Sequence, residues 1–525
     1  MKNVSKVFWI SLITTLLFVF WGVLFPDHLS RMMTTAQSFF LVQFGWFYQL
    51  CASFFLLFAL FLVFSRYGRI KLGKDEDKPE FNQLTWFALL FSAGMGIGLL
   101  FFGVSEPISH YAAPPLGEAK TSEAATEALR YTYLHWGLHA WAIYSSIALA
   151  LAYFKFRKGY PGLMSAALYP LLGERTKGTL GTVIDSVAVF ATIFGVAASL
   201  GLGAAQINGG LSYLTGIPNQ FSIQLIIIAV VTVLFLLSAG TGLQRGIKYL
   251  SNTNMVLAFL LFLGFLIVGP TIFVLNLFTT TFGEYVQYLP SMGLRLAPFN
   301  PERAEWVRGW TIFYWAWWIA WSPFVGTFIA RVSRGRTVRE FVIAVTLIPS
   351  IVCAFWFAVF GGTAIHLEHI LGISISDKNL ETALFYVYEQ LPFNLFFVII
   401  TLLLISTFFI TSADSATFVL GMQTTHGSLN PSTIVKVIWG LLLSASAIAL
   451  MASGGLPAMQ TAIIVSALPL AVVLLLMSVS LLKAFRSEVT KKPKERNGTG
   501  NRIAPIKETL STSRIWRRKN KEPLG

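Results

Sequence analysis

Charged residues are scarce in this chain of 525 residues, at 12% of the sequence. A soluble domain averages about 25% charged residues, so the composition excludes an ordinary cytosolic enzyme and a disordered regulator. The two cysteines, Cys51 and Cys353, lie in apolar stretches and cannot build a disulfide framework, a cysteine metal site or an iron–sulfur cluster. Neither a His-Glu-x-x-His nor a Gly-x-Ser-x-Gly motif occurs, so the sequence gives no support for covalent chemistry.

Long apolar runs dominate the chain, which is 55% hydrophobic. Most runs reach the length of about 20 residues that spans a bilayer, so we predict an all-α polytopic membrane protein with twelve transmembrane helices. The expected spans are 7–25, 45–64, 83–104, 131–153, 180–208, 220–240, 253–278, 309–330, 341–362, 394–422, 434–452 and 458–482. The first run is too long for the apolar part of a signal peptide and lacks an Ala-x-Ala exit, so we expect it to remain as a helix.

The basic residues predict the orientation of these spans. With residues 1–6 in the cytoplasm, the outer loops hold few of the 39 Lys and Arg, namely Arg31, Lys120, Arg130, Arg295, Arg303, Arg308 and Lys378. This distribution obeys the positive-inside rule, and an even number of spans then places both termini in the cytoplasm. The net charge of +15 is therefore explained by membrane topology. Nucleic acid is not an expected partner, because the basic residues are spread over loops and a tail.

Two segments are not expected to span the membrane. Residues 279–308 mix aromatic and charged residues, and we expect them to include an interfacial helix outside the bilayer. Residues 483–525 form a polar, basic tail after the membrane-spanning region 7–482. Two interpretations of the tail stay open, a solvated cytoplasmic extension and an electrostatic contact with anionic lipid.

Acidic residues are nearly absent from the apolar spans. The exceptions are Asp185, Glu106 and Asp414, and ionisable groups within a membrane are functional candidates by default. Asp185 and Asp414 lack the Gly-x-Gly-Asp context of an intramembrane aspartyl protease, and hydroxyl groups flank Asp414 in TSADSA. Glu106 and Pro107 follow the third span, where we expect them to cap or turn the chain. We predict a structural role for all three acids.

The third span contains an unusual run of glycines in the segment FSAGMGIGLLFFG, with Gly94, Gly96 and Gly98 at alternate positions. Each glycine weakens a helix by about 1 kcal/mol relative to alanine. One interpretation is a small-residue face for helix packing. The other is a helix broken at mid-membrane, which frees backbone carbonyls for a cation and directs a helix N-terminus at an anion. Spacing alone does not decide between them.

Two spans carry clusters of aromatic residues. The eighth span contains Trp317, Trp318 and Trp321, followed by Ser322 and Pro323, which favour a kink. The fourth span contains Trp136, Trp141 and Tyr144. A membrane-interface belt is the alternative explanation, although both clusters lie several residues inside their spans. Indole faces bind a quaternary ammonium group well, and because no carboxylate is expected nearby, a zwitterion fits better than a net cation.

These residues resemble the betaine/carnitine/choline transporter (BCCT) family. The resemblance rests on GMGIG at 94–98, on the aromatic set of the fourth span and on WAWWIAWSPFVGTFIARVSRGR at 315–336. It covers nearly the whole chain and is closest to sodium-coupled glycine betaine transporters of Gram-positive bacteria. It implies a LeuT-type fold with two inverted repeats of five helices, about 83–278 and 309–482, after two extra helices. It also implies a homotrimer in a bacterial cell membrane.

The resemblance further implies residue roles. A trimethylammonium box is expected from Trp136, Trp141, Tyr144 and Trp318, with Trp317 and Trp321 completing it or lining the path to the cytoplasm. A sodium ion is expected at the backbone carbonyls of Ser92, Met95 and Phe408 and the hydroxyls of Thr411 and Ser412. Ordinary intrahelical hydrogen bonding is the alternative for the two hydroxyls.

Three further positions refine this expectation. Choline carriers in the family tend to have an acid at the third glycine, where this chain has Gly98. Sodium-independent carnitine exchangers have an arginine in the fifth span, which here has none. The second sodium site of the family uses two threonines, and here the pair is Thr192 and Val196, so the number of ions stays open.

The sequence therefore predicts a symporter that imports glycine betaine as an osmoprotectant, with sodium as the coupling ion and no other cofactor. Two alternatives remain. One is a carrier of another compatible solute, such as ectoine, proline, carnitine or choline. The other is a polytopic membrane enzyme. A channel is disfavoured because no filter motif is visible.

Overall fold

The computed structural model describes residues 4–94, 96–241 and 244–491. Across these residues the secondary structure is helical, apart from one isolated antiparallel bridge between Lys71 and Thr337. Contacts group Met1–Lys483 into one compact unit and Ala484–Gly525 into a second. The all-helical prediction is thus confirmed for the described part of the chain, and most of the basic tail lies outside it.

Ten of the described helices are long and apolar enough to cross a membrane. A helix is suited to this environment because it satisfies its backbone hydrogen bonds internally. The ten segments are Lys6–Leu24 (α1), Pro26–Phe64 (α2), Ser122–Arg157 (α5, Ser122–Trp136, and α6, Leu138–Ala152), Thr179–Thr215 (α9), Phe221–Ala239 (in α10, Phe221–Thr241), Tyr249–Val268 (in α11, Gln244–Val268), Val338–Ile370 (α15, Val338–Ile365, and a π-helical turn), Asn394–Thr424 (α17), Thr433–Ala452 (α18) and Leu456–Thr490 (in α19, Leu456–Lys491).

The remaining two predicted spans contain the glycine and tryptophan motifs. The span expected at 83–104 is divided into α3 (Gln83–Gly94) and α4 (Ile97–Ala112), each too short to cross a bilayer alone. The span expected at 309–330 corresponds to α14 (Phe313–Val332), which is 20 residues long but less apolar because of its tryptophans. The glycines therefore make the third span a weaker candidate for a membrane-spanning helix by length, and the tryptophans make the eighth span a weaker one by composition.

Pro323, which the sequence predicts to favour a kink, lies inside α14 and does not end the helix. The helix continues through this proline to Val332. Proline removes the N–H that would bond to the carbonyl four residues earlier, which is that of Ile319. The hydroxyl of Ser322 donates to this carbonyl at 2.7 Å. The Ser-Pro pair thus restores the missing hydrogen bond locally.

Two other boundaries differ from the prediction. The long helix α2 begins at Pro26, well before the expected residue 45, because a proline in the first turn is compatible with a helix and no later residue breaks it. The span expected at 253–278 ends at Val268, since Gly269 and Pro270 interrupt the helix. The following helix, α12 (Thr271–Gly293), begins inside the predicted span and continues into the segment expected to be interfacial.

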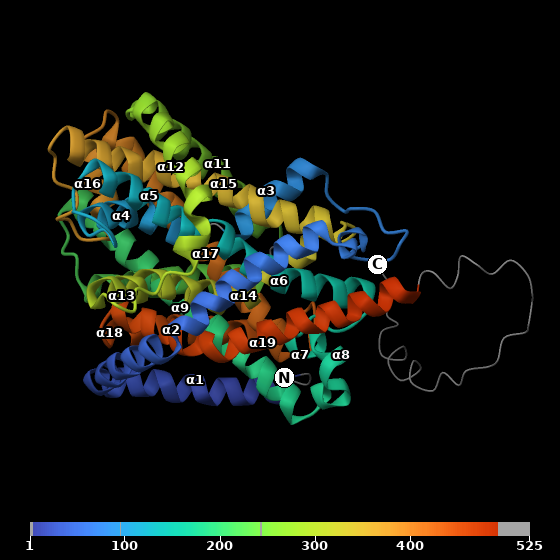
Figure 1. The fold of residues 1–525 in the computed structure, drawn as a ribbon. Coiled ribbons are helices and arrows are strands. Elements are labelled where there is room, and N and C mark those ends of the chain that lie inside the picture. The colour runs from blue at the N-terminus through green and yellow to red at the C-terminus, as the bar shows by residue number, and fades with distance from the viewer. Residues whose placement is uncertain (1–3, 95, 242–243, 492–525) are drawn as a thin grey trace, which may run out of the picture. The chain divides into compact units, whose positions relative to one another are not determined.

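Helix packing brings the two motif-bearing segments together. The aromatic helix α14 packs on α6 and α9 and also contacts α3 and α17. The half-helix α4 packs on α5, α9 and α15. Figure 1 shows α14 in the interior, near α6 and α17. The shorter helices α7 (Met164–Ala167), α8 (Tyr169–Leu172), α13 (Pro301–Val307) and α16 (Ala383–Glu389) lie in connections between the long ones.

Candidate substrate and ion site

The third predicted span is broken at its glycines, as one of its two interpretations predicts. The helix α3 ends at Gly94 and α4 begins at Ile97. Between them, Gly96 has an extended backbone, with φ −161° and ψ −158°. Ser92 belongs to the last turn of α3, whereas Met95 lies outside the described residues. A break of this kind frees backbone groups that a continuous helix would use internally.

Gly98, in the first turn of α4, makes room for two indoles. A Cβ atom at this position would lie 2.9 Å from Cη2 of Trp317 and 3.1 Å from Cη2 of Trp136. Both distances are shorter than ordinary carbon–carbon contacts of about 3.5–4.0 Å. The broken helix therefore lies directly against indoles from two other helices.

The predicted aromatic residues of the fourth and eighth spans form one buried cluster, which we call the aromatic box. It consists of Trp136, Trp141, Tyr144, Trp317, Trp318 and Trp321, each at most 6% exposed. The structure thus brings these rings together inside the bundle, whereas the side chains of an interface belt would face the lipid headgroups. Trp136 meets Trp318 edge to face, with ring centroids 4.9 Å apart, and lies 6.1 Å from Trp317.

The remaining members of the aromatic box continue this chain of ring contacts. Tyr144 lies 5.9 Å from Trp318 and 5.6 Å from Trp141 between ring centroids. Trp317 and Trp318 are stacked with planes 4° apart, and Trp321 lies 6.3 Å from Trp317. The rings contact one another directly, so a ligand has to displace at least one of them or use a face turned away from the others.

A second helix break separates the two tryptophans of the fourth predicted span. Gly137, between α5 and α6, has φ −99° and ψ −134°. A side chain there would overlap the carbonyl of Tyr133 and lie against the hydroxyl of Tyr285 in α12. The N–H of Leu138, at the start of α6, donates to that Tyr285 hydroxyl at 3.0 Å. The break thus lies directly after Trp136 and is bridged by a side chain from α12.

Polar atoms of the aromatic box fall into two groups. The Nε1 of Trp136 donates to Oε2 of Glu106, and the Nε1 of Trp318 donates to the carbonyl of His135, both at 2.7 Å. Three other buried polar atoms have no hydrogen-bond partner among the described residues: Nε1 of Trp317, Nε1 of Trp321 and Oη of Tyr144. Buried polar groups are normally paired, so these three are candidates for contact with a polar ligand.

Glu106 does not turn the chain as predicted. It lies inside α4, which continues to Ala112 through Pro107, because the interruption of the third span occurs at the glycines and not at its end. Gly361 of α15 allows the proline to pack there, since a Cβ atom at Gly361 would overlap the Pro107 ring. The acid therefore points into the bundle instead of capping a helix.

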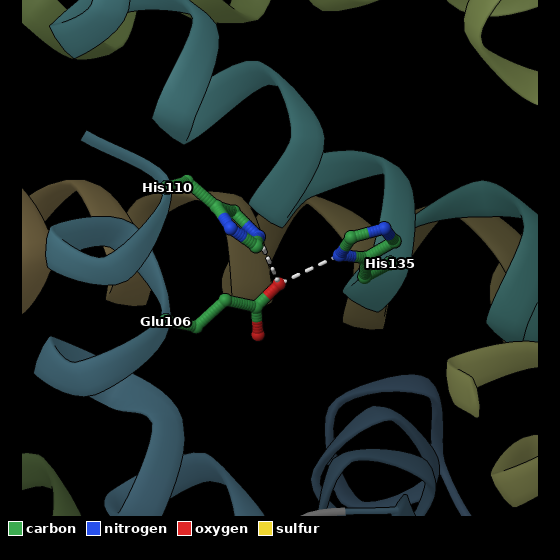
Figure 2. Close-up of side chains that lie close together, drawn as sticks. All are labelled: Glu106, His110 and His135. Carbon is green, nitrogen blue, oxygen red and sulfur yellow. Dashed lines mark hydrogen bonds and ion pairs between the residues drawn. The ribbon is translucent and has the colours of Figure 1, made fainter. Parts of the chain in front are cut away.

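The carboxylate of Glu106 is the centre of a buried polar cluster (Figure 2). Its Oε1 lies 2.7 Å from Nδ1 of His135 and 3.3 Å from Nε2 of His110. Its Oε2 accepts hydrogen bonds from Trp136 and from the hydroxyl of Tyr314. The expectation that no carboxylate lies near the aromatic box is therefore wrong. The sequence could not show this because Glu106 and its partners come from three separate helices.

The other two intramembrane acids have local partners, in agreement with a structural role. Asp185 in α9 accepts two hydrogen bonds from Ser165, from the backbone N–H at 2.9 Å and from the hydroxyl at 2.6 Å. It thereby anchors the segment that begins α7. Asp414 in α17 accepts a hydrogen bond from the Ser238 hydroxyl at 2.8 Å and so links α17 to α10.

The helix break lies close to α17, which carries Phe408, Thr411 and Ser412 of the residues predicted to hold sodium. A Cβ atom at Gly96, in the helix break, would lie 4.0 Å from Oγ of Ser412 in α17. Next to Ser412, the hydroxyl of Thr411 lies 2.9 Å from the carbonyl of Thr407 and 3.2 Å from that of Phe408, and it donates within the helix. Oxygen ligands of this kind suit a hard cation, and the geometry also matches the alternative of intrahelical bonding.

Asn254 of α11 is a polar neighbour of this region that the sequence did not reveal. Its Nδ2 donates to the Thr411 hydroxyl at 3.2 Å, and its Oδ1 is buried without a hydrogen-bond partner among the described residues. At the second ion position, Thr192 donates to the carbonyl of Ala188 at 2.7 Å, and Val196 supplies no hydroxyl. No local motif distinguishes Asn254 from other polar residues in α11.

Aromatic faces next to a broken helix, inside a bundle of membrane-length helices, are typical of a membrane carrier for a small organic solute. The family model described as betaine/carnitine/choline family transporter (BCCT) matches residues 6–490. The chain belongs to this family, and its members are transporters rather than enzymes.

Curated relatives of high similarity are membrane transporters as well. The glycine betaine transporter OpuD of Bacillus subtilis is 56% identical over 489 residues, which is 93% of this chain and 96% of the relative. A probable glycine betaine transporter of Desulfitobacterium hafniense is 45% identical, covering 93% of this chain and 98% of the relative. The ectoine/hydroxyectoine transporter of Virgibacillus pantothenticus is 42% identical, covering 94% of this chain and 98% of the relative.

Proposed function

We propose that this protein is a symporter that imports glycine betaine and is driven by the sodium gradient. The observation that carries the proposal is the aromatic box, buried against a broken helix that also lies close to Ser412. The box supplies the chemistry for a trimethylammonium group, and the break with α17 supplies oxygen atoms for a cation. Relatives named as glycine betaine transporters support the same substrate.

The polarity of the aromatic box supports a zwitterion as substrate. Indole and phenol faces attract a quaternary ammonium group by about 2 kcal/mol or more per contact when water is excluded. The unpaired donors of Trp317, Trp321 and Tyr144 can donate to a carboxylate on the same ligand. A ligand with both groups satisfies the box, whereas a simple cation leaves these donors unpaired.

Sodium is proposed to bind at the helix break, at the carbonyls of Ser92, Met95 and Phe408 and the hydroxyls of Thr411 and Ser412. Thr411 retains a lone pair for an ion, because a hydroxyl has two and Asn254 uses one. An ion here would join α17 to α3 and α4. Because α4 also contacts the indoles through Gly98, ion binding would fix one wall of the aromatic box.

The proposal includes the architecture and setting implied by family resemblance. It comprises twelve spans, two inverted repeats of five helices and cytoplasmic termini. It also comprises a trimer in the bacterial cell membrane, a role in osmoprotection and a basic tail that contacts anionic lipid. The broken third span supports the repeats, because transporters with inverted repeats bind substrate at discontinuous helices near the midplane.

Uptake by proteoliposomes tests the proposal directly. Labelled glycine betaine should accumulate with an inward sodium gradient, and accumulation should stop when potassium replaces sodium. Equal uptake under both conditions would refute the coupling. Competition by ectoine, proline, carnitine and choline then defines the substrate, and stronger competition by ectoine than by betaine would favour the activity named for the Virgibacillus relative.

A further inference from the structure

Two indoles of the aromatic box are anchored through one carboxylate. Trp136 donates directly to Oε2 of Glu106 at 2.7 Å. Trp318 donates to the backbone carbonyl of His135 at 2.7 Å, and Nδ1 of that histidine lies 2.7 Å from Oε1 of Glu106. These are the indoles that meet edge to face at 4.9 Å. The relative orientation of the two indoles therefore depends on Glu106, which is not itself a member of the aromatic box.

Ring stacking extends the same assembly. The hydroxyl of Tyr314 donates to Glu106, and its ring stacks on His135 with centroids 4.7 Å apart and planes 18° apart. The other nitrogen of His135 lies 3.0 Å from the hydroxyl of Thr311, which fixes the position of the imidazole at both ends. Glu106, His135 and Tyr314 are all buried. The Glu106 carboxylate is thus held in place by Trp136, His135 and Tyr314, and it restricts the orientation of these three side chains in turn.

Glu106, His110 and His135 also resemble a set of metal ligands, with all three candidate atoms within 4.8 Å of one another. The distance between Glu106 and His135 favours a hydrogen bond instead. Two ligand atoms that are each about 2.0–2.1 Å from a tetrahedral zinc ion lie roughly 3.3 Å apart. The separation between Oε1 of Glu106 and Nδ1 of His135 is 2.7 Å, a hydrogen-bond distance.

We propose that Glu106 is a positioning residue for substrate binding, acting through Trp136 and, by way of His135, through Trp318. The proposal rests on the proposed function insofar as the ligand carries a quaternary ammonium group. A hydrogen bond to a carboxylate is stronger than one to a neutral acceptor, so it restricts the tilt of the indole more tightly. It also places negative charge at the edge of the ring, next to the N–H, and this charge raises the electron density of both ring faces and so strengthens their attraction for a cation.

The first test measures glycine betaine binding to purified full-length protein by calorimetry. Glu106→Gln removes the charge, and Glu106→Asp keeps the charge but shortens the side chain by one methylene. Each should raise the Kd about tenfold while leaving sodium binding unchanged. Asp185→Asn is the matched control, because it neutralises another buried carboxylate away from the aromatic box, and its Kd should equal that of the wild type. Wild-type affinity in both Glu106 variants would overturn the proposal.

A double-mutant cycle shows whether Glu106 acts through the indole. Trp136→Phe removes the N–H donor, so adding Glu106→Gln to it should raise the Kd less than the same change does in the wild type. Losses that simply multiply would mean that the carboxylate acts independently of Trp136. Affinity that falls with a chelator and returns with zinc would identify a metal centre and also overturn the proposal.

A measurement without substrate separates this inference from the proposed function. The ultraviolet resonance Raman spectrum contains an indole mode that responds to N–H hydrogen bonding. Glu106→Gln should shift this mode in the wild-type background and leave it unchanged in Trp136→Phe. If the wild type binds no betaine, the proposed function fails, while the Raman shift still decides whether Glu106 anchors Trp136. No shift would reject the anchoring role.

Discussion

The indole of Trp317 occupies the space in front of Gly98, so that a Cβ atom at Gly98 would lie only 2.9 Å from Cη2 of the ring. Gly98→Ala is therefore expected to displace Trp317 and lower kcat/KM for betaine uptake. Overpacking costs about 1–3 kcal/mol, which corresponds to a loss of roughly 5-fold to 150-fold. Uptake by reconstituted protein over a range of betaine concentrations measures the effect.

Gly96→Ala provides the comparison for Gly98→Ala. Its Cβ atom would lie 3.7 Å from Cη2 of Trp321, an ordinary contact distance, and the extended φ of −161° suits any residue. We expect a clearly smaller loss of uptake. A larger loss at Gly96 than at Gly98 would contradict the steric explanation.

Trp318 contacts both Trp136 and Tyr144, so it is the link between the aromatic residues of two helices. Trp318→Leu should raise the Kd for betaine by about 30-fold, since the loss of one desolvated cation–π contact costs about 2 kcal/mol. Calorimetric titration of the purified variant with betaine measures this Kd. Trp439→Leu removes another buried indole, whose Nε1 donates to Thr424 in α17, and should leave the Kd unchanged. Equal effects would indicate a general loss of stability.

The sodium dependence of uptake should weaken when hydroxyls beside the helix break are removed. Thr411→Ala and Ser412→Ala each delete a proposed ligand, and we expect the sodium concentration for half-maximal uptake to rise at least several-fold. Thr407→Ala, one turn earlier, is the control because Thr407 is not a proposed ligand and its hydroxyl donates to the carbonyl of Leu403. An unchanged sodium dependence in both test variants would mean that the two hydroxyls do not bind sodium and make intrahelical hydrogen bonds only.

Asn254 orients the Thr411 hydroxyl through a hydrogen bond of 3.2 Å. Asn254→Ala should therefore reduce apparent sodium affinity without changing the saturating rate, because the threonine loses the donor that restricts it. Uptake measured at several sodium concentrations with saturating betaine separates the two quantities. The outcome that counts against this role is a lower saturating rate with normal sodium affinity.

Asp185 is expected to matter for stability and not for transport. Asp185→Asn places an amide against the two donors of Ser165, and a poorly matched buried hydrogen bond costs about 1–3 kcal/mol. Thermal unfolding in detergent should begin at a lower temperature, with the KM for betaine unchanged. Activity lost without a loss of stability would assign Asp185 a direct role in transport.

Much of the fold follows from apolar length, which predicts the ten membrane-length helices. The break within the third span was one of two interpretations of its glycines, and their spacing alone did not decide between them. Helix ends were predicted less well, because they depend on individual residues. Pro26 begins α2 earlier than apolarity suggests, and Gly269 with Pro270 ends α11 within an apolar run. Pro323 shows the opposite case, where the Ser322 hydroxyl replaces a backbone donor and keeps the helix continuous.

The residues of the aromatic box could be named in advance, because two spans carry clusters of aromatic residues and the family resemblance implies that these clusters form one box. The role of Glu106 next to the box could not be predicted, because the proline that follows it led us to expect that it caps or turns the chain. Its role depends on Trp136, His135 and Tyr314, which approach it only when α4, α5 and α14 pack together. Asn254 was missed for the same reason, because its relation to Thr411 requires contact between α11 and α17.

The interruptions at Gly96 and Gly137 have a joint mechanical consequence. They lie in neighbouring segments, since α4 packs against α5. A continuous helix can change direction only if it breaks some of its backbone hydrogen bonds or if it moves as a whole. Here the run of backbone hydrogen bonds is already interrupted at both glycines, and at the second one the N–H of Leu138 donates to Tyr285 instead. We therefore expect α3, α4, α5 and α6 to change their relative angles around a solute without unwinding.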